Sequence, residues 1–232
     1  MRKLLSAVFL LSLTCALQAT PVRVAITPMN IYIPFGHDSN DNVEVIVEGN
    51  LPNLCYSSPR LRVVERLGDR IHVELDALYD KEMNCAMISL PFIEKLSLGV
   101  LQEGLYDLSV NHQQVKSLNE SLVIAAAKTE HVDDYIYANV QMIENVPGER
   151  AVYLKGSNPS LCVQLKEVKW ISNKKNTYSI LPIMEQVGDD CSSVRSNFSY
   201  KFEVPNELDT DRVLLHVRRM NGSSVNSIYY NN

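Results

Sequence analysis

A short phrase ending in cysteine occurs twice in this chain of 232 residues, about a hundred residues apart. The first copy, GNLPNLC, runs from Gly49 to Cys55. The second, GSNPSLC, runs from Gly156 to Cys162, with glycine, proline, leucine and cysteine at identical spacing. One more cysteine, Cys85 or Cys191, follows each copy after about 30 residues. A repeat of this length that carries its own pair of cysteines predicts two related domains rather than one large one.

The N-terminal segment has the composition of a secretory signal peptide. A short positive head precedes an apolar run from Leu4 to Leu13, and small or tolerated residues lead to a cleavage point after Ala19. The apolar run is too short for a permanent membrane anchor. We therefore expect residues 1–19 to be removed and the mature protein to be periplasmic or secreted, with no transmembrane segment. A lipoprotein anchor through Cys15 is the alternative.

Four cysteines remain in the mature chain once Cys15 is removed. An even count in an exported protein favours disulfides over metal thiolates. The spacing also does not suit zinc, because there is no C-x-x-C pair and no histidine close behind a cysteine. Of the three possible pairings, the repeat selects Cys55 with Cys85 and Cys162 with Cys191, since each domain then closes itself.

Apolar and polar residues alternate along most of the chain, and long helical periodicity is absent, so we expect an all-β protein. About seven short strands in each repeat indicate two consecutive immunoglobulin-like antiparallel β-sandwiches, each with one intradomain disulfide. The first sandwich should span residues 20–128, a short linker 129–134, and the second sandwich 135–232. The predicted strands are Val22–Ile26, Val43–Val47, Leu61–Arg66, Ile71–Leu78, Phe92–Leu98, Leu105–Val110, Leu122–Ala126, Tyr135–Met142, Ala151–Leu154, Val163–Ile171, Tyr178–Met184, Phe198–Val204, Val213–Met220 and Val225–Tyr230.

Turn residues support the strand breaks. Gly68-Asp69 and Asn221-Gly222 are each typical of a tight hairpin. The matched strands keep the same alternation in both repeats, but Asn111 corresponds to Asn221 only at a longer spacing. The linker lacks glycine and proline, which predicts two sandwiches placed end to end with limited bending.

The first repeat resembles an Ig-like domain found in many exported bacterial proteins and lipoproteins. The resemblance covers roughly Val43 to Asn111. The residues that carry it are Leu51-Pro52, Cys55, Cys85, Pro91-Phe92, Gly104-Leu105-Tyr106 and Val110-Asn111. The second repeat keeps the proline, both cysteines and Phe198, but lacks the proline before that phenylalanine and the glycine-x-tyrosine. The family carries no agreed activity, so the resemblance implies location and architecture only.

No pattern of catalytic residues stands out. The formal net charge of −5 argues against a nucleic-acid-binding protein, and we expect the basic pair Arg218-Arg219 to be exposed. There is no G-x-S-x-G elbow, no glycine-rich phosphate loop and no histidine pair at a metal-ligand spacing. We therefore expect no catalytic residue, cofactor or metal. The run from Asp38 to Glu44 is the best cation candidate, although a solvated turn is the simpler interpretation.

The expected function is that of an exported non-enzymatic binding or scaffolding protein of the cell envelope, acting on another envelope or extracellular protein. Candidate contact residues are Asp38 and Asp41 in a polar loop, and Tyr135 and Tyr137 on one strand face. A secreted protease inhibitor that presents a disulfide-braced loop, from Cys55 to Arg60, is the alternative. A hydrolase with its site at the domain junction is a third and weaker hypothesis.

Overall fold

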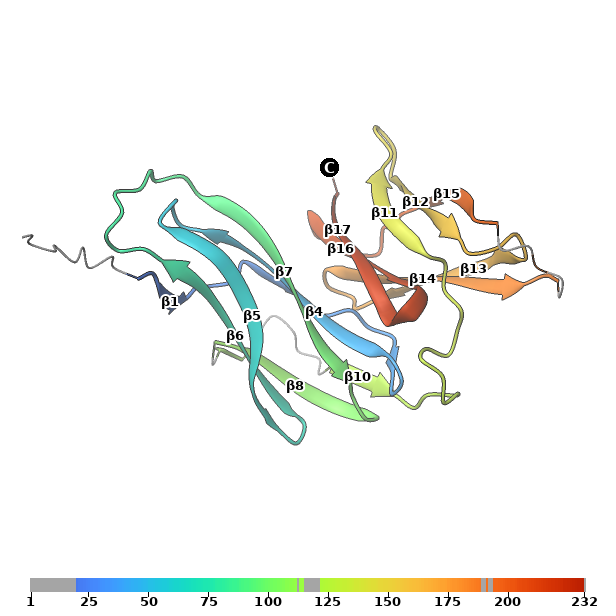
Figure 1. Ribbon diagram of the computed structural model, residues 1–232, viewed down its shortest axis with the longest axis horizontal. Helices are drawn as coiled ribbons and strands as arrows, with labels where there is room; N and C mark the ends of the chain where they lie inside the picture. The colour runs from blue at the N-terminus through green and yellow to red at the C-terminus, as the bar shows by residue number, and fades with distance from the viewer. Residues whose placement is uncertain (1–19, 112, 115–121, 189–190, 192–193, 232) are drawn as a thin grey trace, which may run out of the picture.

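The computed structural model describes residues 20–111, 113–114, 122–188, 191 and 194–231, so the predicted signal peptide lies outside the described part of the chain. The protein is all-β, as predicted, and its strands form two regions (Figure 1). The first region contains β1 (Val22–Ala25), β2 (Asn30–Tyr32), β3 (His37–Asp38), β4 (Asn42–Leu51), β5 (Tyr56–Leu67), β6 (Arg70–Tyr79), β7 (Leu90–Val100), β8 (Gly104–Val110), β9 (Gln113–Gln114) and β10 (Leu122–Ala125). The second region contains β11 (Val140–Asn145), β12 (Ala151–Asn158), β13 (Val163–Ser172), β14 (Thr177–Gln186), β15 (Ser196–Glu203), β16 (Arg212–Arg219), the 3₁₀ turn η1 (Met220–Gly222) and β17 (Ser223–Tyr230).

The two regions repeat one strand order. In the first, β2-β4-β7 form one sheet, while β6, β8 and β10 lie side by side in the other, with β5 on the free side of β6. In the second, β11-β12-β15 and β13-β14-β16-β17 form the equivalent sheets. Most pairs are antiparallel, as predicted, but β3 with β10, β6 with β8 and β14 with β16 are parallel. The strand that lies between β6 and β8 in sequence, β7, belongs to the opposite sheet, and so does β15, which lies between β14 and β16. The chain therefore returns to the first sheet in its original direction.

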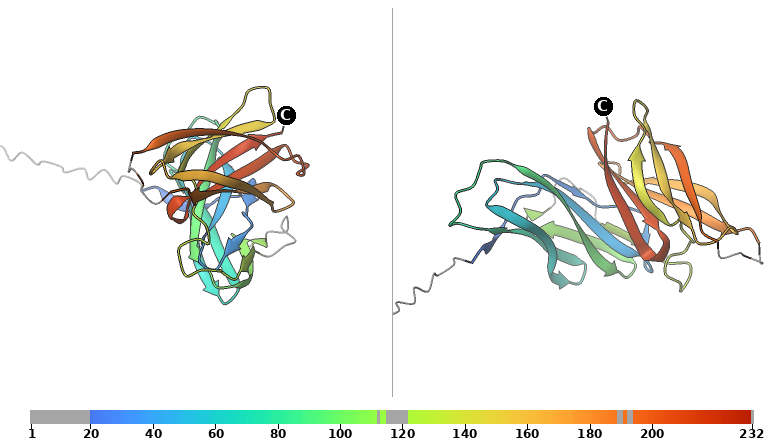
Figure 2. Two further views of the ribbon diagram at one scale, coloured as in Figure 1. Left: turned by 90° about the vertical axis from the view of Figure 1, so that its right-hand side faces the viewer. Right: turned by 45° about the horizontal axis from the view of Figure 1, so that its top comes forward.

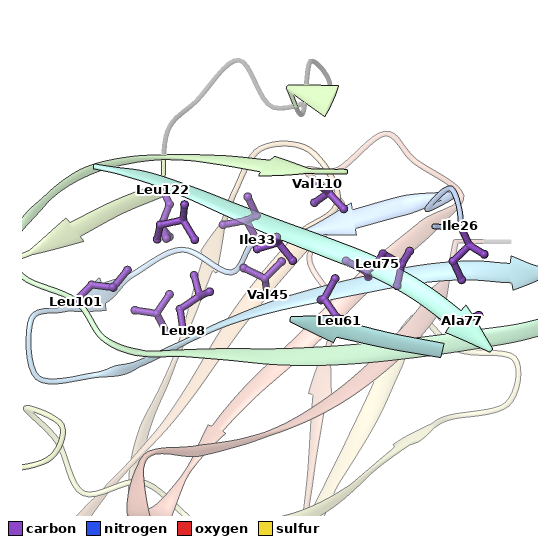
Figure 3. Close-up of a cluster of buried hydrophobic side chains, with 14 of the residues drawn as sticks. Ile26, Ile33, Val45, Leu61, Leu75, Ala77, Leu98, Leu101, Val110 and Leu122 are labelled. Atoms are coloured by element: carbon purple, nitrogen blue, oxygen red, sulfur yellow. The ribbon is translucent and has the colours of Figure 1, made fainter. Parts of the chain in front are cut away.

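The core of the first region lies between its two sheets (Figure 3). Along β4, Val43, Val45 and Val47 are fully buried and point toward β6, where Val73 and Leu75 are also fully buried. Their spacing of two residues is the one expected of side chains that share one face of a strand.

The glycine of the repeated phrase is explained by the strand that pairs with it. Gly49 lies opposite Phe92, and Gly156 lies opposite Phe198. A Cβ atom on Gly49 would come within 2.5 Å of the Phe92 ring, and one on Gly156 would come within 2.7 Å of Phe198 and would also overlap the carbonyl oxygen of Asn139. Each phenylalanine therefore covers a glycine backbone that no side chain could occupy.

Both predicted disulfides are confirmed. Cys55 pairs with Cys85 and Cys162 pairs with Cys191, and the Cα atoms of each pair are 5.4 Å apart. This separation is typical of a disulfide. Each bridge ties the last residue of the repeated phrase to the segment before β7 or β15.

One predicted hairpin is confirmed, and two other predicted elements differ in detail. The hairpin at Gly68-Asp69 is confirmed, with Leu67 paired to Arg70. The hairpin at Asn221-Gly222 also forms, but three residues rather than two separate the last paired residues, Arg219 and Ser223. The strand predicted at Tyr135–Met142 begins only at Val140, because the residues before it make a bridge to β14 rather than a ladder.

The two regions do not merely follow one another end to end. The β16–β17 hairpin lies against the outer face of β4 (Figure 2). Fully buried Tyr32 and Ile46 from the first region pack there with Leu214 and Ile228 from the second. Both β4 and β16 are therefore buried on both faces.

Candidate functional site

The four predicted contact residues gather around this junction between the two regions. Asp41 and Tyr137 are each only 2% exposed, while Asp38 and Tyr135 are half-buried. The polar loop that we expected to be solvated is closed by its own hydrogen bonds. The backbone N–H of Asp38 donates to Asp41 Oδ2 at 2.7 Å, and the N–H of Asp41 donates to the carbonyl of Asp38 at 3.0 Å. Asp41 and Tyr137 therefore contact other parts of the chain and are not open to a partner.

The sheet faces at the junction carry opposite charges. Glu44 and Glu48 point out of β4 on either side of Ile46, and Arg212 and Arg218 point out of β16 with His216 between them. Arg212 is ion-paired with Glu48, whose carboxylate also accepts the hydroxyl of Tyr32 at 2.8 Å. Burial and the hydrogen bond to that carboxylate raise the pKa of Tyr32 above its usual value, so its phenol stays protonated.

Glu44 anchors the middle of the same junction. It binds Lys95 Nζ at 2.9 Å and accepts the hydroxyl of Ser224, which lies on β17. His216 Nδ1 is 2.8 Å from Asn226 Oδ1 and 4.0 Å from Glu44 Oε2. Burial lowers the pKa of His216 to about 4, although the nearby Glu44 charge acts in the opposite direction. The imidazole is therefore neutral at ordinary pH.

Arg218 is the central group of the junction, and the sequence interpretation of it as an exposed residue was wrong. The residue is 5% exposed. Its guanidinium donates to Asp41 Oδ2 at 2.6 Å, to the carbonyl of Gly36, and to His37 Nδ1 at 2.9 Å. Breaking a buried ion pair by removing one partner typically costs about 3–5 kcal/mol, because the other charge is left uncompensated.

Asp133 adds a second carboxyl group beside Asp41. It is 7% exposed. Burial, then a hydrogen bond to Asp41 and the charge of that carboxylate, raise the pKa of Asp133 to about 7. Asp133 can therefore carry a proton near neutral pH and donate it to Asp41, which leaves Arg218 facing a single carboxylate charge.

Loops extend the junction on one side. Asn173 and Asn176 donate side-chain hydrogen bonds to the carbonyls of Ile33 and Ile31, each at 3.2 Å. Asn173 is completely buried, and its Oδ1 accepts three backbone N–H groups of its own turn, which fixes the direction of its amide. Gly36 lies against Ile171 so closely that an added Cβ would come within 2.5 Å of that side chain.

The linker is also held in place. Asn40 Nδ2 reaches the carbonyls of Thr129 and His131 at 3.1 and 2.9 Å, and Asp134 Oδ1 at 3.0 Å. Asp134 in turn accepts the backbone N–H groups of Lys128 and Thr129. These hydrogen bonds outweigh partial burial and lower the pKa of Asp134 below its usual value. The short linker therefore belongs to the junction rather than being a free tether.

The hollow at the junction is too small for a substrate. It measures about 10 Å³ and is lined by polar groups that include Asp41, Asp133 and His216. A volume of this size holds about one water molecule. A larger hollow of about 430 Å³ lies on the outer face of β5 and β6, beside Glu65, His72 and Glu74. Within the described part of the chain, no group of three His, Cys, Asp or Glu residues is arranged to hold a metal ion, and no helix is long and apolar enough to span a membrane.

The segment suspected of inhibiting a protease is part of the sheet. Tyr56 opens β5, where it pairs with Tyr79 of β6. Arg60 Nη2 donates to Asp76 Oδ2 at 2.7 Å, and Arg23 binds the other oxygen of that carboxylate at 2.5 Å. Burial would raise the pKa of Asp76, but the hydrogen bonds from Arg60 and Arg23 outweigh it and lower the pKa. Most of this segment is therefore paired with β6, and the ladder is interrupted only by a bulge at Ser58 and Pro59.

Exposed apolar side chains gather at the disulfide end of the first region. Met87 is 81% exposed, and Met83, Ile88, Leu54 and Leu90 are 58, 55, 43 and 39% exposed. They lie together, because the N–H of Leu54 donates to the carbonyl of Ala86 at 3.2 Å and Cys55 is bonded to Cys85. We call these five residues the first apolar end. Three of them, Met83, Met87 and Ile88, lie in the β6–β7 loop, which is at the left of Figure 1, away from the second region.

The second region has a similar feature at its own disulfide end. Leu161, Val187 and Val194 are 57, 50 and 58% exposed, and we call these three residues the second apolar end. The C-terminal end of β14, directly before Val187, lies on the side of the second region away from the first region in both Figure 1 and the right view of Figure 2. Leu54 and Leu161 occupy the same position of the repeated phrase, directly before the cysteine.

One comparison with known proteins gave a match. Residues 45–119 match the family model of the ORF11 beta-sandwich domain. The match falls within the first repeat and overlaps the stretch from Val43 to Asn111 that resembles an exported Ig-like domain. It names a β-sandwich, but neither an Ig-like family nor a second copy of the domain. No curated protein and no solved structure matched the chain.

Proposed function

We propose that this protein is an exported, non-enzymatic scaffolding protein of the cell envelope that holds partner proteins at its two apolar ends. The observation that carries the proposal is the exposure of Leu54 and Leu161, which the repeat places at equivalent positions. A leucine in a core should be buried, but these two project beside the disulfides. Contiguous exposed apolar residues with a polar rim are typical of protein-binding surfaces.

The composition of the first apolar end supports a protein partner. Met83 and Met87 have flexible, polarisable side chains that adapt to an apolar surface of varied shape. Cys55–Cys85 holds the backbone beneath them, so less conformational entropy is lost when a partner binds. The second apolar end is smaller, which favours a smaller or weaker contact there.

The junction between the regions supports the scaffolding part of the proposal. Its buried ion pairs and apolar contacts keep the two ends at one separation. Two contacts at a fixed spacing can act together on one assembly, with an effective concentration set by the rigid connection. A loosely linked pair of domains would lose this advantage.

Site-specific photocrosslinking in the producing cells tests the proposal. A photoreactive residue at position 87 or 161 should give discrete protein adducts, whereas one at Leu105, which is 62% exposed on the outer face of β8, should give none. The double substitution M87D and I88D should remove the adduct formed from a probe at position 54 without lowering the melting temperature. Equal labelling from all positions would contradict the proposal.

A further inference from the structure

We propose that the docking of the two regions is a proton-sensitive latch, which is closed while the His37 imidazole is neutral and opens when the junction histidines take up protons. The proposal goes beyond the proposed function, because it concerns the movement of one region against the other and not the partners at the ends. It rests on the hydrogen-bond geometry of His37 and Arg218 across the junction.

The contact between these two side chains fixes the protonation state of the histidine. His37 Nδ1 is 2.9 Å from Arg218 Nη2, and both residues are almost fully buried. A guanidinium has only donors, so Arg218 must donate and Nδ1 must offer a lone pair. The docked arrangement therefore requires neutral His37 with its proton on Nε2.

Protonation of His37 removes this hydrogen bond. An added proton on Nδ1 would face the N–H of Arg218, and two positive charges would meet in a buried site. His37 Nε2 has no hydrogen-bond partner among the described residues, so the new charge gains no compensating contact there. Burial first, and then the charges of Arg218 and His216, hold the pKa of His37 well below its usual value.

The charged and titratable groups around His37 come from every element of the junction. Asp41 Oδ2 is 4.0 Å from His37 Nδ1, but it is already bound by Arg218. The His216 ring centroid is 6.0 Å from that of His37. The remaining groups are Asp38 on β3, Glu44 on β4, Lys95 on β7, Asp133 in the linker and Tyr137 after it.

The signs of the three pKa shifts determine the pH dependence. The pKa values of His37 and His216 are lowered in the docked state, so their contribution to docking is complete above about pH 6.5 and is lost as the pH falls below it. The pKa of Asp133 is raised to about 7, so its contribution is complete at low pH and is lost as the pH rises toward 7. The two histidine protons therefore oppose docking on acidification, whereas the Asp133 proton favours it, and the smaller rise in the pKa of Asp38, caused first by burial, acts in the same direction as that of Asp133.

The net balance predicts the steepness of opening. Between about pH 6.5 and 4.5, the equilibrium constant for undocking should rise about tenfold for each unit of acidification. If either histidine is removed, one proton opposes docking and one favours it, so the equilibrium constant for undocking should hardly change with pH. Removing Asp133 should leave both histidines unopposed, and the slope should become about a hundredfold per unit.

Förster transfer across the junction can measure this equilibrium in the full mature chain. Dyes placed through noncanonical amino acids at Leu67 and Met142, which are 62 and 50% exposed, report the distance between the regions without adding cysteines. The wild-type protein should lose transfer with acidification while its far-ultraviolet circular dichroism stays constant. A transfer efficiency that does not change between pH 8 and 4.5 would overturn the proposal.

Three variants separate the latch from general acid denaturation. His37→Asn keeps an acceptor for Arg218 but cannot gain a proton, so its profile should be nearly flat. His131→Asn is the matched control, because His131 is an exposed linker residue, and it should behave like the wild type. If His37→Asn is undocked at every pH, Asp133→Asn decides the question. A slope of about a hundredfold per pH unit supports the latch, whereas the wild-type slope overturns it.

Discussion

The two regions share one strand order, but the residue that follows their parallel strand pair differs in type and in role. In the first region, Asn111 follows β8 with a φ of 51° and lies between β1 and β6. Its Oδ1 accepts the backbone N–H of Leu75 at 2.8 Å, and its Nδ2 donates to the carbonyl of Ile26 at 2.8 Å. Asn111 therefore joins two strands of its own sheet.

In the second region, Arg218 takes the place of Asn111. The parallel pair of Val73 with Val110 corresponds to the pair of Ile180 with Val217, so the residue after each pair is equivalent. The earlier match of Asn111 with Asn221 was therefore wrong, and the repeat keeps its spacing to the end of β16. The position of Leu75 is filled by Pro182, which is paired in the same way with Val168.

This exchange explains why the arginine can reach across the junction. Proline has no backbone N–H, so the second region needs no side-chain acceptor at that place. Arg218 instead extends to Asp41 of the first region. The comparison teaches that one position of a duplicated fold can serve the sheet in one copy and the contact between copies in the other.

Replacing each of these two residues is the strongest way to break the comparison. Arg218→Met leaves buried Asp41 without its cation, so docking should weaken by about 3–5 kcal/mol. Asn111→Ala leaves the N–H of Leu75 unpaired and should lower the stability of the first region by about 1–3 kcal/mol. Förster transfer measures the first effect, and urea unfolding measures the second.

The neighbouring arginine is a matched control. Arg219 binds Ser223 and Val140 within its own region, so Arg219→Met should leave docking unchanged. If Asn111→Ala opened the junction, or if Arg218→Met left it closed, the assignment of one role to each copy would fail.

The two disulfides should contribute equally to the free energy of unfolding of their regions. They close loops of nearly the same length, with sequence separations of 30 and 29 residues. On the chain-entropy account, the loss of either one should destabilise its region by about 3.6 kcal/mol. Urea unfolding of C55S/C85S and C162S/C191S measures both values. A gap of more than about 1 kcal/mol would mean that strain or residual structure, and not loop closure, dominates one of them.

The repeat made much of the fold readable from sequence. Cysteine spacing predicted both bridges, and period-two alternation predicted most of the strands, because each has one face on a core. β2, β3 and β9 were missed, since strands of two or three residues contain too few positions to show a period.

The junction was harder to predict because its partners are far apart in the chain. Asp41 and Arg218 are separated by 177 residues, and nothing local indicates that a polar loop will be covered by another sheet. One signal was present. Ile46 and Leu214 occupy outward-facing positions of their strands, between polar or charged residues, and both are fully buried. An apolar residue on a face expected to be solvated indicates a second covering layer.

The glycines of the repeated phrase should respond differently to the same change. In Gly49→Ala, the new methyl group meets the ring of half-buried Phe92, which can turn outward. In Gly156→Ala, it also overlaps the carbonyl oxygen of Asn139, which belongs to the backbone and cannot turn away. We expect losses of about 1 and 3 kcal/mol, respectively, in the free energy of unfolding. Equal losses would show that the backbone near Asn139 yields as easily as a ring.

The leucines of the same phrase should have the smallest effect on stability. Leu54 and Leu161 are exposed, so Leu54→Ser and Leu161→Ser should each change the free energy of unfolding by less than about 0.5 kcal/mol. Leu51, which is 5% exposed three residues earlier, is the internal control, and Leu51→Ser should cost about 2–5 kcal/mol. Thermal melts of the three variants test this order. If the exposed leucines proved as costly as Leu51, their recurrence would be a requirement of folding, and the argument for binding at the apolar ends would lose its main support.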